Sequence, residues 1–266
     1  MESLLHFREY SPGIPGTGVI PVILIHGLFG SGDNFHTVAV ELARDYPVVV
    51  PDMRNHGRSF HSPDTSYEAM AGDLERLMDR LSIPKAYIVG HSMGGKCAMR
   101  FAALNPDRAA ALVIEDIGPG VHPQHYRRET DAMLDLDVHS LESRGSAEKI
   151  LEKSVPDPVL RLFLLKNLER AGDGTYRWRN NIEGISEGYD EIWKPAVSTG
   201  MIYDGPGLFL KGEKSRAITP NDREIIRRQF PGSTVRVVED AGHWIHAEKR
   251  DDFITAVRDF IASIPK

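Results

Sequence analysis

The feature that most constrains this fold is a regular alternation between short β-branched runs and helical patterns, which begins at Val19. The runs lack polar alternation, as strands covered on both faces do, and lie at residues 22–25, 46–50, 86–89, 111–115, 207–211 and 234–238. Between them, apolar residues recur three and four apart and predict helices at 33–44, 66–81, 93–104, 219–229 and 249–264. This order predicts an α/β fold with a mostly parallel sheet flanked by helices.

Three other stretches do not follow this alternation. Residues 4–9 fit an extra edge strand, and residues 11–18, with their Pro and Gly content, fit a turn or loop. The alternation stops after Gly118 and resumes at about Gly205, and the patterns between read as helices only, at 127–136, 146–155, 158–171 and 184–193. We therefore predict a core of residues 1–118 and 201–266 with an inserted helical cap of residues 119–200.

Composition excludes several classes of function. The 266 residues fit one large α/β unit, and 32 basic against 38 acidic residues give a net charge of −6, which argues against a nucleic-acid partner. The single cysteine, Cys97, cannot form an internal disulfide, and we see neither a signal-peptide pattern nor an apolar run that could span a bilayer. No metal-ligand spacing and no phosphate-binding glycine loop is present, so we expect a cytoplasmic protein without metal or nucleotide cofactor.

A short motif after the strand at 86–89 suggests the chemistry. Residues 90–94 read GHSMG, which matches G-x-S-x-G, and a predicted helix follows directly. This chemistry needs a sharp turn from strand to helix, in which small flanking residues permit crowded backbone and the helix N-terminus faces developing negative charge. We predict that Ser92 is a nucleophile; the alternative is a purely structural glycine-rich turn.

Four motifs together resemble one family. They are HGLFGS at 26–31, DMRNHGRS at 52–59, GHSMGGK at 90–96 and AGHWIHAEK at 241–249. Nearly the whole chain resembles the α/β-hydrolase fold, and within it the YbfF-type acyl esterases and their mitochondrial α/β-hydrolase-domain relatives. The resemblance implies an oxyanion hole made by the backbone N–H of Met93 and that of Leu28 or Phe29. We interpret residues 52–57 as a structural turn held by hydrogen bonds.

A serine hydroxyl needs a base, and the chain order expected for this fold is serine, acid, histidine. His243 follows the strand at 234–238 and fits that order. His246, three residues on, is the nearest rival, but a histidine near the start of a helix more often caps or packs. His91 is expected to pack under the nucleophile turn, and the remaining histidines carry no companion signal.

The acid is the least obvious member of the set. Many relatives have Gly-x-x-Asp after the strand before the last, whereas this chain has Ser215 at the fourth position. Two carboxylates remain as candidates for the acid, Glu213 and Asp116. Asp116 follows the earlier strand at 111–115, at the edge of the sheet where it can reach His243. Its neighbour Glu115 is expected to face away. The resemblance implies the same choice, with Ser215 adding a hydrogen bond. We therefore predict Asp116.

These residues predict hydrolysis of a carboxylic ester or thioester of a short to medium acyl chain, through an acyl-serine intermediate. An apolar acyl pocket is expected between core and cap, with Phe29, Trp244 and Ser215 as candidate substrate-binding residues, although Phe29 and Trp244 could equally pack in the core. Dehalogenases and epoxide hydrolases of this fold use an aspartate nucleophile, which Ser92 argues against. A cofactor-free perhydrolase or lyase, or a non-catalytic ligand receptor, remain alternatives. Cys97 is expected in the core, and Lys96 has no predicted role.

Overall fold

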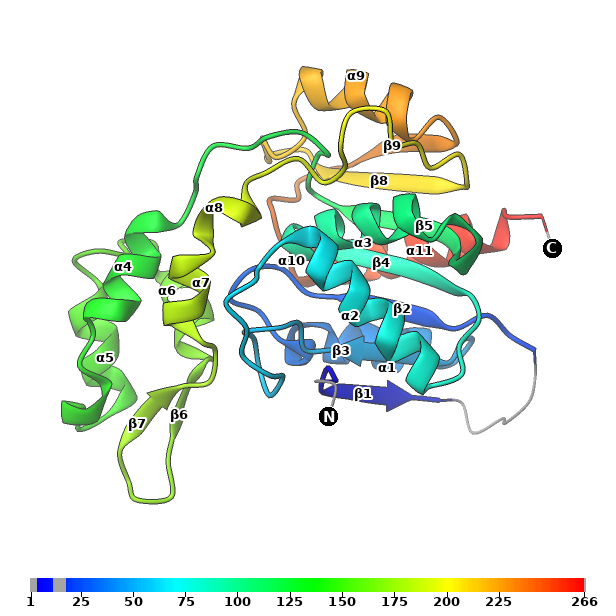
Figure 1. The fold of residues 1–266 in the computed structure, drawn as a ribbon. Coiled ribbons are helices and arrows are strands. Elements are labelled where there is room, and N and C mark those ends of the chain that lie inside the picture. Colours follow the sequence, from blue (N-terminus) through cyan, green and yellow to red (C-terminus); the bar gives the residue numbers. More distant parts are fainter. Residues whose placement is uncertain (1–3, 12–17, 266) are drawn as a thin grey trace.

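The computed structural model describes residues 4–11 and 18–265. Their main sheet has seven strands in the order β1-β3-β2-β4-β5-β8-β9 (Figure 1). The strands are β1 (Phe7–Tyr10), β2 (Val22–Ile25), β3 (Val48–Pro51), β4 (Ala86–His91), β5 (Ala109–Glu115), β8 (Gly207–Gly212) and β9 (Ser233–Val238). All neighbours pair in parallel except β1, which runs antiparallel to β3 at one edge. The predicted α/β fold with a mostly parallel sheet is confirmed.

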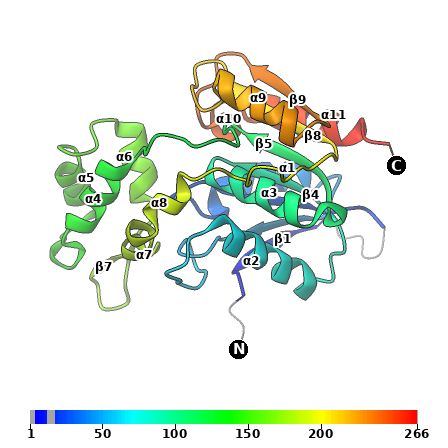
Figure 2. The same cartoon turned by 45° about the horizontal axis from the view of Figure 1, so that its top comes forward.

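Helices cover both faces of this sheet (Figures 1 and 2). One face is covered by α2 (Tyr67–Arg80), α3 (Met93–Leu104) and α9 (Pro220–Gln229), and the other by α1 (His36–Leu42), α10 (Ile245–Glu248) and α11 (Arg250–Ala262). Strand β2 shows why the strands are apolar throughout. Ile23 and Ile25 pack into the first hydrophobic core, whereas Val22 and Leu24 pack into the second, because successive side chains point to opposite faces.

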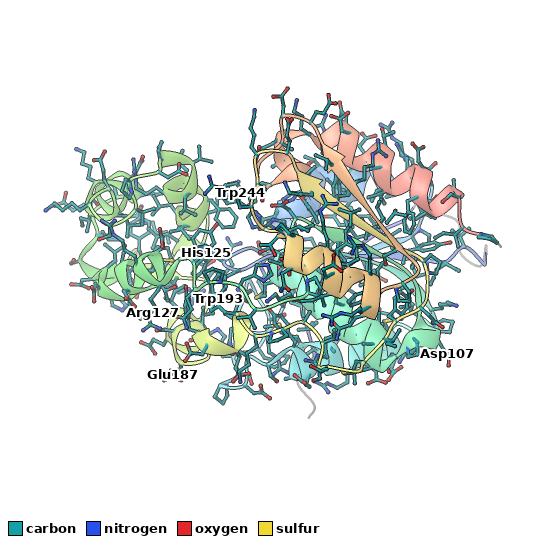
Figure 3. The ribbon with its side chains drawn as sticks, turned by 90° about the horizontal axis from the view of Figure 1, so that it is seen from above. Asp107, His125, Arg127, Glu187, Trp193 and Trp244 are labelled. Atoms are coloured by element: carbon teal, nitrogen blue, oxygen red, sulfur yellow. The ribbon has the colours of Figure 1, made fainter. Side chains whose placement is uncertain are left out.

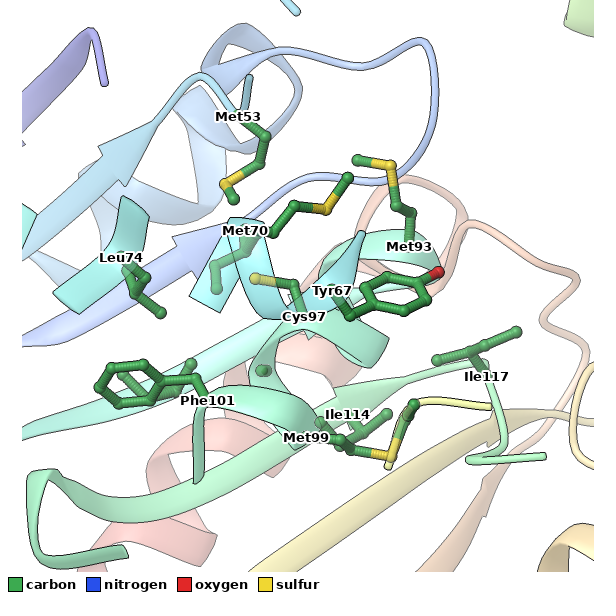
Figure 4. Close-up of a cluster of buried hydrophobic side chains, with 14 of the residues drawn as sticks. Met53, Tyr67, Met70, Leu74, Met93, Cys97, Met99, Phe101, Ile114 and Ile117 are labelled. Carbon is green, nitrogen blue, oxygen red and sulfur yellow. The ribbon is translucent and has the colours of Figure 1, made fainter. Parts of the chain in front are cut away.

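The core beneath α2 and α3 lies directly behind the nucleophile turn. Figure 4 shows the Cys97 side chain beside Met70 and Tyr67, and Cys97 is fully buried. The expectation that Cys97 is a core residue is confirmed.

Helix α2 begins after Ser66, which is its N-cap. The Ser66 hydroxyl accepts a hydrogen bond from the Ala69 amide.

The chain between β5 and β8 forms a separate layer, which we call the insertion (residues 119–200; Figure 1). It contains α4 (Arg127–Asp135), α5 (Arg144–Leu151), α6 (Pro158–Leu165), β6 (Leu168–Arg170), β7 (Tyr176–Trp178), α7 (Ile182–Glu187) and α8 (Tyr189–Ile192). Its buried side chains continue the first core, through Met133, Leu164 and Ile185. The insertion is therefore packed against the core through apolar contacts.

The prediction that this segment is entirely helical is wrong. The helix expected over 158–171 ends at Leu165, and β6 and β7 follow as an antiparallel hairpin. Gly174 supplies a φ of +91° in the hairpin turn, a conformation that glycine adopts without strain. Leu168 is buried and Trp178 donates its indole N–H to the Met133 carbonyl at 3.0 Å, so tertiary packing holds the short strands. The expected helix 184–193 is two helices, α7 and α8, with Gly188 between them.

Smaller differences occur at element ends. The helix expected over 33–44 begins as a 3-10 turn, Gly32–Phe35, before α1; two further 3-10 turns are Pro106–Arg108 and Val138–Ser140. The edge strand expected at 4–9 is β1, and most of the loop expected at 11–18 lies outside the described residues. None of the helices in the described part of the chain combines the length and apolar character that a bilayer crossing requires.

Candidate active site

Ser92 occupies a strained turn between β4 and α3. Its φ of 52° and ψ of −117° lie outside the regions that L-residues normally adopt, and strain of this kind is concentrated at functional sites. The flanking glycines permit it. A Cβ at Gly90 would lie 2.3 Å from the Gly94 carbonyl oxygen, and one at Gly94 would lie 2.4 Å from that of Ile25. The local sequence therefore forces the serine onto a sharp turn at the N-terminus of a twelve-residue helix.

His243 lies in the loop after β9, next to a buried carboxylate. Its Nδ1 is 2.8 Å from Oδ2 of Asp116, whose side chain is completely buried. Asp116 follows β5 with a φ of 49°. Its Oδ1 accepts the Gly212 amide at 2.9 Å, and Oδ2 also accepts the Ser215 hydroxyl. The carboxylate is thus fixed by three donors, and the structure brings together Asp116, Ser215 and His243.

A second histidine ties the His243 loop to the serine turn. His91, directly before Ser92, donates from Nε2 to the His243 carbonyl at 3.0 Å, and the two rings lie 4.7 Å apart. Burial lowers the pKa of His91 well below its usual value, so its ring is neutral. As expected, His91 packs beside the turn.

The rivals for base and acid are occupied elsewhere. Nδ1 of His246 donates to Oε1 of Glu115 at 2.8 Å, and this pair is buried. Glu115 therefore points away from His243, as expected. The Glu213 side chain accepts the Asp240 amide at 2.9 Å at an exposed loop.

Within the described residues, one set of side chains has the proximity that a metal site needs. The donor atoms of His91, Glu115 and His246 lie within 4.8 Å of one another, and all three side chains are buried. Each of these side chains already forms a hydrogen bond, His246 to Glu115 and His91 to the backbone of His243. We therefore describe the group as a hydrogen-bonded network beneath the His243 loop.

The loop after β2 supplies the candidate oxyanion donors. The Phe29 amide, one of two candidates, donates to Nε2 of His56 at 3.2 Å. Burial lowers the pKa of His56 to about 3, so the ring is neutral and can accept this bond. Leu28 lines one pocket with Ser92 and Met93. Of the two alternatives, Leu28 is therefore the better placed donor. His56 was expected to have only a structural role, and its bond to Phe29 is consistent with that.

This pocket lies between the core and the insertion. The core contributes Leu28, Tyr67, Ser92, Met93, Lys96 and Ile117, and the insertion contributes His122, Tyr126, Ile192 and Trp193. Sequence reasoning missed most of these residues. The one available signal was Lys96, a charged residue on an otherwise mostly apolar helix, four positions after Ser92.

The three predicted substrate-binding residues lie outside this pocket lining. Trp244 packs between the His243 ring and Phe163 of α6, with both ring centroids 5.8 Å away. Figure 3 shows Trp193 and Trp244 where the insertion meets the core. Phe29 is buried, and its carbonyl accepts the Asn167 side chain at 2.6 Å. Ser215 holds Asp116. Ser215 therefore positions the Asp116 carboxylate, whereas Phe29 and Trp244 contact residues of the insertion.

Most of the turn at 52–57 is fixed by buried hydrogen bonds. Asp52 accepts the Gly32 amide at 2.7 Å and the Arg58 amide at 2.9 Å. Arg54 forms a two-point ion pair with Asp73 of α2, at 2.6 and 2.8 Å. These contacts support the interpretation of the segment as a structural turn.

A parallel sheet that carries a strained serine between strand and helix, with a histidine–carboxylate pair alongside, is the arrangement of the α/β-hydrolase class. A model of the alpha/beta hydrolase fold matches residues 20–148. The sn-1-specific diacylglycerol lipase ABHD11 of Danio rerio is 40% identical, over 91% of this chain and 78% of that protein. Esterase YbfF of Escherichia coli K12 is 36% identical, over 91% of this chain and 92% of that protein.

A solved structure agrees with these sequence matches. A marine microorganism esterase superposes with a TM-score of 0.92 at 37% identity, over 97% of this chain and 100% of that chain. This chain belongs to the α/β-hydrolase fold family. The resemblance inferred from its four motifs is confirmed.

Proposed function

We propose that this protein is a serine hydrolase that cleaves carboxylic esters or thioesters of short to medium acyl chains through an acyl-serine intermediate. The observation that carries the proposal is Ser92, held in a strained turn at a pocket that it shares with Leu28 and Met93, beside the His243–Asp116 pair. Relatives named as an esterase and as diacylglycerol lipases support the same class of reaction.

The proposed first half-reaction forms the acyl-enzyme. Nε2 of His243 accepts the proton of Ser92 as Oγ bonds to the carbonyl carbon, and the carbonyl oxygen becomes an oxyanion. The backbone N–H groups of Leu28 and Met93 stabilise that oxyanion. As the tetrahedral intermediate collapses, the bond to the leaving alcohol or thiol breaks, and the leaving group takes the proton from His243.

The second half-reaction restores the enzyme. Water gives a proton to His243 and attacks the acyl carbon, and the carboxylic acid leaves as Ser92 regains its proton. Asp116 accepts Nδ1–H of His243 throughout, which keeps Nε2 free to act as the base and stabilises the imidazolium.

We propose that residues 119–200 form a cap that sets acyl-chain preference over a core of residues 1–118 and 201–266. Support comes from the pocket, because Ile192 and Trp193 of the cap segment line it together with Ser92. Replacing the cap by a short loop is expected to change the chain-length profile of a protein that still folds. If the chain-length profile of that protein is unchanged, the cap does not determine acyl-chain preference.

A panel of p-nitrophenyl esters from acetyl to octanoyl, with thioesters of the same acids, tests the activity. We expect turnover by the wild type and a loss on the order of 10⁶ for Ser92→Ala. Ser263→Ala is a matched control, because Ser263 is exposed at the end of α11 and does not line the pocket that contains Ser92. A Ser92→Ala protein that retains more than a few per cent of the activity would refute the assignment.

The same panel separates the alternatives. A perhydrolase or a lyase would release a peracid or an elimination product, which product analysis by mass spectrometry identifies. A ligand receptor would give no turnover of any ester. A small-molecule acyl substrate and a cytoplasmic location complete the proposal.

A further inference from the structure

Lys96 carries a buried amino group that the proposed mechanism does not use. It lies on α3 four residues after Ser92, and only 2% of it is exposed. Its Nζ donates to the carbonyl oxygens of Gly120, at 2.9 Å, and Lys194, at 2.6 Å. These two carbonyls belong to the segments that lead into and out of the helices of the insertion.

No carboxylate of the described residues lies within ion-pair distance of this ammonium. Asp222 acts on it from further away, but the Asp222 carboxylate already accepts the amides of Gly120 and Thr219 and the Thr219 hydroxyl. Burial lowers the pKa of Lys96 to about 7, against the opposing effect of Asp222. At neutral pH this amine is therefore close to the balance between its charged and uncharged forms, and an anion bound beside it would favour the charged form.

The surroundings of Lys96 favour an anion. Lys96 lines the same pocket as Ser92, and none of the residues that line this pocket is acidic. An ammonium has three N–H donors, of which two bond to the carbonyls of Gly120 and Lys194. Nζ also lies 5.9 Å from the centroid of the Tyr67 ring, and none of the hydrogen bonds among the described residues uses its third N–H. Tyr126, which lines the pocket with a φ of 69°, is a further strained residue at this place.

Lys96 follows Ser92 by four residues, about one helical turn, and both residues line the same pocket. A substrate carbonyl at Ser92 would lie against the Leu28 and Met93 amides, and a second acceptor at the far end of a short acyl chain would lie at Lys96. A short dicarboxylate is the simplest ligand that presents a carbonyl group to Ser92 and an anion to Lys96.

We propose that Lys96 is a specificity-determining residue that selects short acyl groups with a terminal carboxylate, so that monoesters of dicarboxylic acids are preferred over uncharged esters of similar length. This proposal rests on the esterase function proposed above. It assigns the substrate class at the same pocket.

The test compares mono-p-nitrophenyl glutarate with its methyl ester, which has the same acyl skeleton without the charge. The measured quantity is the ratio of kcat/KM for the two substrates. We expect a ratio above ten for the wild type, and a fall of roughly ten- to a hundredfold in Lys96→Met, the range of one charge-assisted hydrogen bond. Lys194→Met is the matched control, since the Lys194 ammonium is at the surface with Glu191 and its removal should leave the ratio unchanged.

Inhibition of the wild type provides a measurement that needs no variant. Glutarate should compete with the uncharged ester at least tenfold better than pentanoate does; equal inhibition would overturn the proposal, as would a Lys96→Met ratio equal to that of the wild type. If the wild type turns over both esters without preference, this inference fails and the esterase function stands. If it turns over neither ester, the esterase function itself fails.

Discussion

Replacing Asp116 with asparagine perturbs the proposed catalytic acid while preserving its shape. The carboxylate accepts three hydrogen bonds, from Gly212 on one oxygen and from Ser215 and His243 on the other. An amide has one oxygen and an NH₂ group that only donates. If its oxygen stays on Gly212, the NH₂ group faces Nδ1 of His243 and forces the ring proton to Nε2. A ring in that tautomer cannot accept the proton of Ser92.

The expected loss follows from the wrong tautomer. In a serine protease of the same chemistry, the acid-to-amide change lowers kcat by about 10⁴. At 1.36 kcal/mol per factor of ten, this corresponds to about 5.4 kcal/mol of transition-state stabilisation. The other amide orientation offers no escape, because it would point the NH₂ group at the Gly212 amide, where two donors meet in a fully buried place.

Steady-state turnover of a p-nitrophenyl ester by folded Asp116→Asn, Glu213→Gln and Ser215→Ala proteins measures the effect. Glu213→Gln should be close to wild type, because Glu213 contacts the Asp240 amide at the surface. Ser215→Ala removes one of the three bonds to Asp116 and should lose about tenfold. Near-wild-type activity in Asp116→Asn together with collapse in Glu213→Gln would show that the acid lies on the other strand.

Three further predictions concern stability and reactivity. Asp73→Asn leaves the buried Arg54 guanidinium without its carboxylate and should reduce the free energy of unfolding by about 3–5 kcal/mol in a urea titration; a loss below about 1 kcal/mol would contradict this. The pKa of Lys96 is about 7 when folded and near its usual value when unfolded, so above pH 7 the unfolded chain binds the extra proton and stability rises with pH. Between about pH 7 and pH 9, the free energy of unfolding of the wild type should rise by roughly 2 kcal/mol relative to that of Lys96→Met, as measured by urea titrations at each pH. If the two proteins show the same pH dependence, the pKa of Lys96 is not lowered by folding. Burial raises the pKa of the Cys97 thiol, so a maleimide should label it in urea but not in the native enzyme; rapid native labelling would place Cys97 at the surface.

The sheet could be predicted because its information is local. Each parallel strand is an apolar run covered on both faces, and each crossover helix shows its own periodicity, so the pattern persists without knowledge of distant contacts. The nucleophile turn is local as well, since Gly90 and Gly94 sit within two residues of Ser92 and permit its strain. The pairing of Asp116 with His243, 127 residues apart, was inferred from strand order, because strands that end at the same sheet edge bring their loops together.

The insertion was harder to predict because its short elements depend on tertiary contacts. Strands β6 and β7 have three residues each, and packing of Leu168 and Trp178 against the neighbouring helices holds them. The environment of Lys96 could not be predicted either, since its partners are backbone carbonyls 24 and 98 residues away. A carbonyl carries no side-chain signature in the sequence. Trp244 could not be distinguished from a pocket residue either, because its partner Phe163 lies in a different part of the chain and only the structure shows their contact.

The most direct test of the central claim is the position of a covalent adduct. A fluorophosphonate reacts with a serine only where a base activates it and an oxyanion site stabilises the phosphoryl oxygen. Intact-mass analysis of the wild type, followed by peptide mapping, should find one adduct per chain, on Ser92, and Ser92→Ala should remain unlabelled. An adduct on a different residue would contradict the account. So would full esterase activity in a protein whose Ser92 is completely labelled.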